Sequence, residues 1–242
     1  MTSRIVICIP INLSNRRDFA AALENKYGTE YVLTERMLRS TVNNDSCEIN
    51  FCTVDGGSNF IEDFELSGQD RLDAATIKQS NICQVIYLSS FKTGYNSCLE
   101  IARLAQAMLM IGGIGIKLES TGIVHNQAKW LANYNSDDVF DTYSLFVTLV
   151  EGDDRYYSCG MHSFGKADVA VDLSVDIGLA IYVMNVFNYY RLTESPILQD
   201  GHTFRPDIEC PKYQIKWTTD GETEIDSPQY NPYGRWHLRV SS

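Results

Sequence analysis

The chain has 242 residues, which is enough to bury a sizeable hydrophobic core without disulfides or metals as cross-links. Its 31 acidic and 20 basic residues give a formal net charge of −11, which disfavours direct binding to nucleic acids and to anionic membranes. No apolar run is long enough to span a bilayer, and the first residues lack the pattern of a signal peptide, so we expect a cytoplasmic protein with reduced cysteines.

The amino-terminal half alternates between strand-like and helix-like patterns. We expect strands at 4–11, 31–42, 48–54 and 83–89, although the start of the second is also compatible with a helix. A helix capped by Ser14 and ended by Gly28 follows the first strand. The pattern weakens between 55 and 80, where we expect a turn and a short helix.

The clearest helix covers 97–111. It has one apolar face and ends at two glycines; the face consists of Cys98, Ile101, Ala102, Ala105, Met108 and Leu109. After it we expect a strand at 114–119, a short helix at 126–133, paired strands at 144–150 and 155–159, and a strand at 169–173. A second strong helix covers 175–190, capped by Ser174, and strands at 213–219 and 235–240 follow.

Helices and strands therefore alternate without a regular β-α-β order. This arrangement predicts an α+β fold with a mixed, largely antiparallel sheet packed with two main helices. We expect a single domain over 1–242, in which 196–242 is a strand-rich carboxy-terminal extension.

The segment Arg155–Asp172 contains the most reactive combination of side chains. Cys159, His162, Lys166 and Asp168 lie in one compact turn, which suits a hydrolase-like site with a nucleophile, a base and an orienting acid. Neighbours in sequence rarely have the geometry of a triad, which is assembled from distant segments.

A structural interpretation of the same turn is therefore favoured. In this interpretation Met161 and Phe164 pack inward, while His162 points to solvent or caps a backbone group. Cys159 and His162 lack a well-spaced second pair of ligands, so we predict no metal site. Gly112, Gly113 and Gly115 follow a helix instead of preceding one, so we also predict no nucleotide cofactor.

Two surface features indicate a protein partner. Acidic residues gather at Asp137, Asp138 and Asp141, at Glu151, Asp153 and Asp154, and again over 220–226; they would attract a basic protein, although solubility alone also explains them. Tyr233, Arg235 and Trp236 are of the types that interfaces favour, although a strand that completes the sheet explains them equally well.

Several motifs together resemble a bacterial domain-of-unknown-function family, numbered four-two-six-one, over roughly residues 83–192. The matching positions are Ala102 and Ala105, Ser120 to Gly122, Trp130, and Gly160, Met161, Phe164, Gly165 and Asp168. The resemblance implies an α+β fold in a bacterial cytoplasm, and it brings no established activity, cofactor or catalytic residue. By analogy, relatives of this kind look like immunity proteins.

The leading hypothesis is therefore a non-catalytic binding protein, an immunity or antitoxin protein that occludes the active site of a cognate toxin. Its acidic loops at Asp137–Asp141 and Glu151–Asp154 would meet a basic cleft. The alternative is a hydrolase-like enzyme with its site at the Cys159–Asp168 turn. A third hypothesis is a structural module that uses its aromatic carboxy-terminal segment as a contact.

Overall fold

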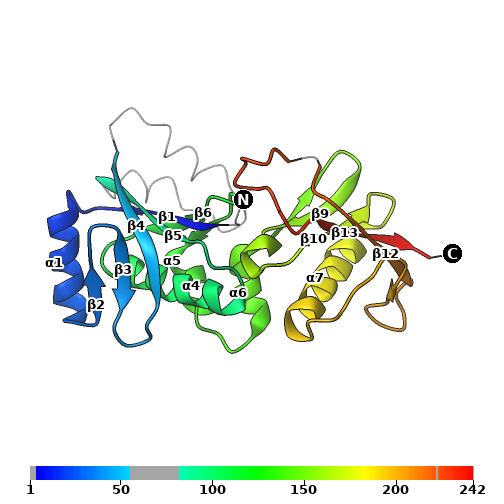
Figure 1. The fold of residues 1–242 in the computed structure, drawn as a ribbon, viewed down its shortest axis with the longest axis horizontal. Coiled ribbons are helices and arrows are strands. Elements are labelled where there is room, and N and C mark those ends of the chain that lie inside the picture. Colours follow the sequence, from blue (N-terminus) through cyan, green and yellow to red (C-terminus); the bar gives the residue numbers. More distant parts are fainter. Residues whose placement is uncertain (1–3, 55–81, 222, 242) are drawn as a thin grey trace.

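A computed structural model describes residues 4–54, 82–221 and 223–241. Two sheets lie side by side along the long axis of the molecule, and the longest helices lie beneath them in the view of Figure 1. The expected α+β fold with largely antiparallel pairing is confirmed, but the strands form two sheets where we expected one. The turn and short helix expected between 55 and 80 lie outside the described residues.

The amino-terminal half forms a seven-stranded sheet, here called sheet A, in the order β2-β3-β4-β5-β1-β6-β7. Every pair in it is antiparallel. Its strands are β1 (Ile5–Ile11), β2 (Tyr31–Leu33), β3 (Met37–Ser40), β4 (Ser46–Thr53), β5 (Gln84–Ser90), β6 (Gly115–Leu118) and β7 (Val124–Asn126). The single strand expected over 31–42 is a hairpin, because the chain turns at Thr34, whose hydroxyl accepts the Met37 N–H at 3.1 Å.

One helix, α4 (Tyr95–Met110), packs across sheet A and forms its main core. Strand alternation brings Ile5, Ile7, Ile9 and Ile11 of β1 into this core, each with no exposed surface. The predicted apolar face of the helix is buried, as expected. Such burial contributes about 2 kcal/mol for each large aliphatic side chain, which makes this contact the principal source of stability in this half.

Two smaller helices complete this half. α1 (Arg16–Tyr27) is capped by Asn15 and not by the expected Ser14, since the Asn15 side chain accepts the N–H groups of Arg17 and Asp18. α5 (Gln127–Asn133) carries the fully buried Trp130, whose indole N–H donates to the Ala102 carbonyl of α4 at 3.2 Å.

The carboxy-terminal half forms a six-stranded sheet, sheet B, in the order β11-β12-β13-β10-β9-β8. Its strands are β8 (Thr148–Glu151), β9 (Arg155–Cys159), β10 (Asp168–Asp172), β11 (Thr203–Phe204), β12 (Tyr213–Thr218) and β13 (Arg235–Val240). β10 and β13 are parallel and the other pairs are antiparallel. α7 (Ile177–Thr193) covers one face and packs on a second hydrophobic cluster.

Two boundaries in this half differ from expectation. The strand expected from 144 begins at Thr148, because 139–146 forms a helix that we did not predict, α6 (Val139–Phe146), capped by the Asp138 carboxylate on the Phe140 N–H at 2.8 Å. α7 is capped by Asp176, which accepts the Leu179 N–H at 3.1 Å, and not by Ser174. The expectation of a single domain stays a prediction.

The two sheets meet through α6 and the loop before α4. The Tyr143 hydroxyl of α6 donates to Asn185 at 2.9 Å and accepts from Asn188 at 3.1 Å, and both partners belong to α7. The Gly94 N–H donates to the Ser163 carbonyl at 2.9 Å. Within the described ranges, no helix is both long and apolar enough to cross a membrane.

Gly160 packs so closely against the Phe146 backbone that adding a single methyl group at this position should strongly destabilise the fold. Gly160 has φ +120°, and a Cβ at this position would overlap the Phe146 carbonyl oxygen. We expect Gly160→Ala to lower the free energy of unfolding by about 3 kcal/mol or more. The control is Gly122→Ala, which has φ +70° but open space around its Cβ and should cost about 1 kcal/mol. Urea denaturation measures both; equal losses would show that the overlap is relieved without penalty.

Candidate functional site

The Cys159–Asp168 turn lies at the junction of the two sheets. Its centre is η1 (Met161–Phe164), a single 3-10 turn between Gly160 and Gly165, which both have positive φ angles. Met161 and Phe164 pack inward as expected, and Phe164 contacts the Phe146 ring edge-on. The expectation that His162 points to solvent is wrong: only 1% of the residue is exposed, because the tight turn is enclosed on all sides.

The Asp168 carboxylate accepts hydrogen bonds from three separate segments. Oδ1 accepts the Ser158 hydroxyl of β9 at 3.1 Å and the Met161 N–H at 3.2 Å. Oδ2 accepts the Asn231 amide at 2.6 Å, which ties the segment before β13 to the turn. Burial raises the pKa of Asp168 to about 6, although these hydrogen bonds and the nearby Arg191 act in the opposite direction.

A buried cation stands beside this carboxylate. The Arg191 guanidinium of α7 donates to the Ala167 carbonyl at 2.7 Å and to the Asn188 side chain. Burial lowers the pKa of Arg191 to about 10, while Asp168 acts to raise it. Together with Tyr143, these groups form a continuous polar network from sheet B to α6.

Sequence reasoning missed three members of this network: Asn188, Arg191 and Asn231. The first two had a usable signal, because they are polar residues three positions apart within the apolar α7 pattern and are therefore on one face of the helix. Asn231 had none, since it lies in a polar loop 63 residues from its partner Asp168.

The four residues of the hydrolase-like alternative share the turn, but their contacts lead in different directions. The Cys159 thiol donates to the Ser120 carbonyl at 3.7 Å, and the Lys166 ammonium donates to the Ser195 hydroxyl at 3.5 Å. Burial raises the pKa of Cys159 to about 12 and lowers that of His162 to about 4. The thiol is therefore protonated at neutral pH, whereas a nucleophile needs the thiolate.

The six acidic residues of the loops at Asp137–Asp141 and Glu151–Asp154 divide into two groups. Three have local contacts: Asp138 caps α6, Asp141 accepts the Ser136 hydroxyl at 2.6 Å, and Asp154 pairs with Arg155. The other three, Asp137, Glu151 and Asp153, are exposed and have no such contact in the described part of the chain. The exposed three can meet a partner without breaking a contact that holds the fold.

The three residues expected at the aromatic interface differ in exposure and in their contacts. Tyr233 is 37% exposed, and its hydroxyl lies 3.3 Å from that of Thr93. Arg235 is buried, with its guanidinium 4.6 Å from the centre of the Tyr157 ring and 3.9 Å from Asp220. Trp236 packs half-buried against the sheet B cluster. β13 completes sheet B, as the structural interpretation of this segment expected.

Within 4–54, 82–221 and 223–241, no group of three or more His, Cys, Asp or Glu side chains is placed to hold a metal ion. No protein-family model, curated protein or solved structure matches the chain. The resemblance to the domain-of-unknown-function family therefore stays a prediction.

Asp168→Asn should change the pH dependence of stability in a defined direction. Burial holds the folded pKa at about 6, above the ordinary 3.8, so between these values the folded protein binds more protons than the unfolded chain. The contribution of the protonated carboxyl is complete below about pH 4 and is lost as the pH rises through 6. The unfolding free energy of wild type relative to Asp168→Asn should fall by about 2.5 kcal/mol from pH 4 to pH 7.

His162→Gln supplies the comparison of opposite sign. Burial lowers the folded pKa of His162 from 6.5 to about 4, so its stabilising contribution is complete above pH 6.5 and is lost as the pH falls toward 4. The unfolding free energy of wild type relative to His162→Gln should rise by about 3 kcal/mol from pH 4 to pH 7. Urea titrations across this range measure both differences, and two flat profiles would contradict the burial of these charges.

Thiol labelling distinguishes the structural and catalytic interpretations of Cys159. We expect iodoacetamide at about pH 8 to modify the exposed Cys52 in the native protein and to modify Cys159 only after unfolding, because burial keeps its thiol protonated. Peptide mass mapping over time measures both rates. Modification of Cys159 faster than Cys52 would instead favour the hydrolase-like alternative.

Proposed function

We propose that this protein acts in the cytoplasm as a non-catalytic binding protein of the immunity or antitoxin kind. Its partner is a basic toxin whose active site it covers. One observation carries the proposal: His162 and Asp168, the base and the acid of the hydrolase-like alternative, are buried in the junction, while Asp137, Glu151 and Asp153 face water. Occlusion by binding requires only a rigid, complementary surface.

The α6–β8 segment gives this surface its rigidity. One acidic cluster lies at the start of α6 and the other begins at the last residue of β8, and Val147 alone separates the two elements. Between the clusters, Tyr143 and Phe146 are buried in the sheet A core, and Tyr143 also bonds to α7. The two clusters are therefore held at a fixed separation before a partner arrives, which limits the ordering that binding requires.

Electrostatics favours a basic partner. The formal net charge of −11 raises the rate at which a cationic protein encounters this one, and the exposed carboxylates select the orientation in which it docks. The resemblance over 83–192, a segment that includes both acidic clusters, points in the same direction by analogy.

The hydrolase-like alternative draws on one observation, the raised pKa of Asp168, since shifted carboxyl groups gather at functional sites. Desolvation in a structural network has the same effect. The three hydrogen bonds that Asp168 accepts all come from the protein itself, and they occupy both of its oxygens. We therefore keep binding as the proposal.

The test compares two triple charge reversals after a partner has been captured from host cells and purified. The first variant is Asp137→Lys, Glu151→Lys and Asp153→Lys. Its matched control is Glu24→Lys, Glu30→Lys and Glu35→Lys, which are equally exposed positions in and after α1. Each triple changes the formal net charge from −11 to −5, so only the location of the charge differs.

We expect the first triple to weaken binding by about tenfold or more and to flatten its salt dependence, with a much smaller effect of the control. The captured partner should be toxic when expressed alone and harmless when this protein is co-expressed. An acidic partner, an equal effect of the two triples, or no partner at physiological salt would each overturn the proposal.

A further inference from the structure

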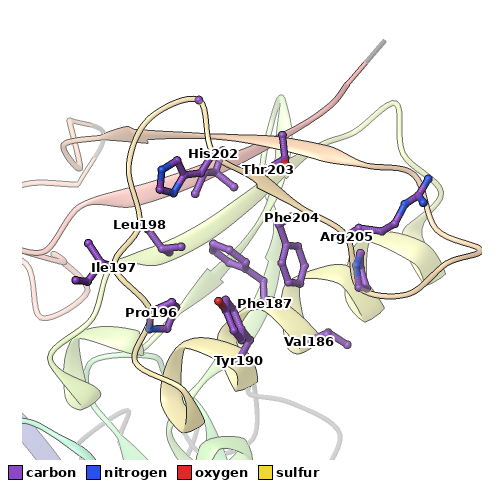
Figure 2. A pocket seen from close by; sticks show the side chains of 13 residues that line it. Val186, Phe187, Tyr190, Pro196, Ile197, Leu198, His202, Thr203, Phe204 and Arg205 are labelled. Carbon is purple, nitrogen blue, oxygen red and sulfur yellow. The ribbon is translucent and has the colours of Figure 1, made fainter.

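A pocket of about 750 Å³ opens between the second half of α7 and the segment 196–206. Figure 2 shows Phe187 and Tyr190 of α7 between Pro196, Ile197 and Leu198 on one side and Phe204 of β11 on the other. This volume lies in the range that small-molecule sites occupy in proteins. Neither the acidic clusters nor the Cys159–Asp168 turn contributes a residue to it.

Aromatic rings form the centre of the pocket. Phe187 and Phe204 meet edge-on with 4.9 Å between ring centres, and Tyr190 stacks on Phe204 at 6.0 Å with 25° between the ring planes. Figure 2 shows the three rings close together inside the pocket. Ile197 on the opposite wall is 87% exposed, which leaves a large apolar side chain in water until something covers it. A flat aromatic body fits such a lining, because it can stack on one ring and meet another by its edge.

The charge of the lining is opposite to that of the whole chain. In a protein with 31 acidic residues, none of the 13 lining residues is Asp or Glu, whereas Arg205 and His202 stand at its two ends. Within the described part of the chain, Arg205 has no ion-pair partner. The neighbouring Asp207 is engaged elsewhere, since it accepts the Tyr182 hydroxyl at 2.9 Å and the Glu209 N–H at 2.8 Å.

We propose that this pocket binds a small aromatic carboxylate. The aromatic body lies among Phe187, Tyr190 and Phe204, and the carboxylate pairs with the Arg205 guanidinium, which offers two parallel donors. Figure 2 shows the Arg205 side chain extended away from the rings, so binding swings it back across the mouth of the pocket. This site goes beyond the proposed function and does not depend on it.

A series of three ligands with one ring system tests the charge preference. Titration calorimetry with the purified full chain compares 2-naphthoate, 2-naphthamide and 2-naphthylmethylammonium. We expect 2-naphthoate to bind with a dissociation constant below about 1 mM and at least about fivefold more tightly than the amide, with the ammonium weakest. Equal affinities for the three, or no binding of 2-naphthoate up to about 5 mM, would overturn the proposal.

Two pairs of variants, each with a matched control, test whether 2-naphthoate binds in this pocket. Arg205→Gln should weaken 2-naphthoate by about fivefold and leave the amide unchanged, whereas Lys212→Gln, at an exposed position outside the lining, should change neither. Ile197→Asp puts a carboxylate at the wall and should weaken 2-naphthoate, whereas Ile208→Asp should not; the two isoleucines are 87% and 86% exposed, so both variants should fold. Equal effects within either pair would place the ligand elsewhere. These titrations contain no protein partner, so their failure and that of the partner experiment are separate results.

Discussion

The buried carboxylate of Asp168 is the contact on which the junction side of sheet B depends. It joins β9, the 3-10 turn that follows β9 and the segment before β13, and so it reinforces the pairing of β10 with its two neighbouring strands. Removing a charge from water is costly unless its oxygens are satisfied, and here the protein supplies every donor. The arrangement is therefore specific: displacing any of the three segments leaves a buried carboxylate without one of its hydrogen bonds.

α7 extends the effect of this contact across sheet B. Asn188 and Arg191 face the junction, where they meet Tyr143 and the Ala167 carbonyl. Val186 and Tyr190 face the aromatic pocket. A helix with a partner on each side has apolar residues around most of its circumference, which explains why α7 has no single clear polar face. The junction and the pocket are thus two surfaces of one rigid element.

The hydrophobic periodicity of the sequence predicted those helices and strands that are determined by local residue patterns. The 97–111 helix and the strands at 155–159 and 235–240 match the structure closely, because each buries a face with the spacing that its backbone imposes. α6 was missed because its sequence, VFDTYSLF, is rich in β-branched and aromatic residues, which favour strands. The hairpin at 31–40 was read as one strand because its turn contains no glycine or proline.

The candidate site was harder to predict than the fold for a related reason. The turn itself was visible from Gly160, Gly165 and the apolar residues between them. Whether the turn is structural or catalytic depends on its contacts with Asn231 and Arg191, and both residues are distant from the turn in sequence. A cysteine, a histidine and an acid in one turn look alike in sequence whether they face a substrate or a protein interior. Burial favours the second case here, since it raises the pKa of Cys159 and lowers that of His162, away from the values that nucleophilic catalysis needs.

The distribution of charge follows from the same burial. Three described arginines that are buried or half-buried each stand near an acid: Arg103 with Asp45 at 2.7 Å, Arg235 with Asp220 at 3.9 Å, and Arg191 beside Asp168. Because these sets are neutral, they contribute nothing to the net charge of −11, which is carried by the remaining side chains. Among the described carboxylates, the exposed Asp137, Glu151 and Asp153 have no such internal role to explain them. Excess negative charge at exposed positions attracts or repels molecules that approach the protein. This is the physical reason for expecting that the protein functions by binding a partner.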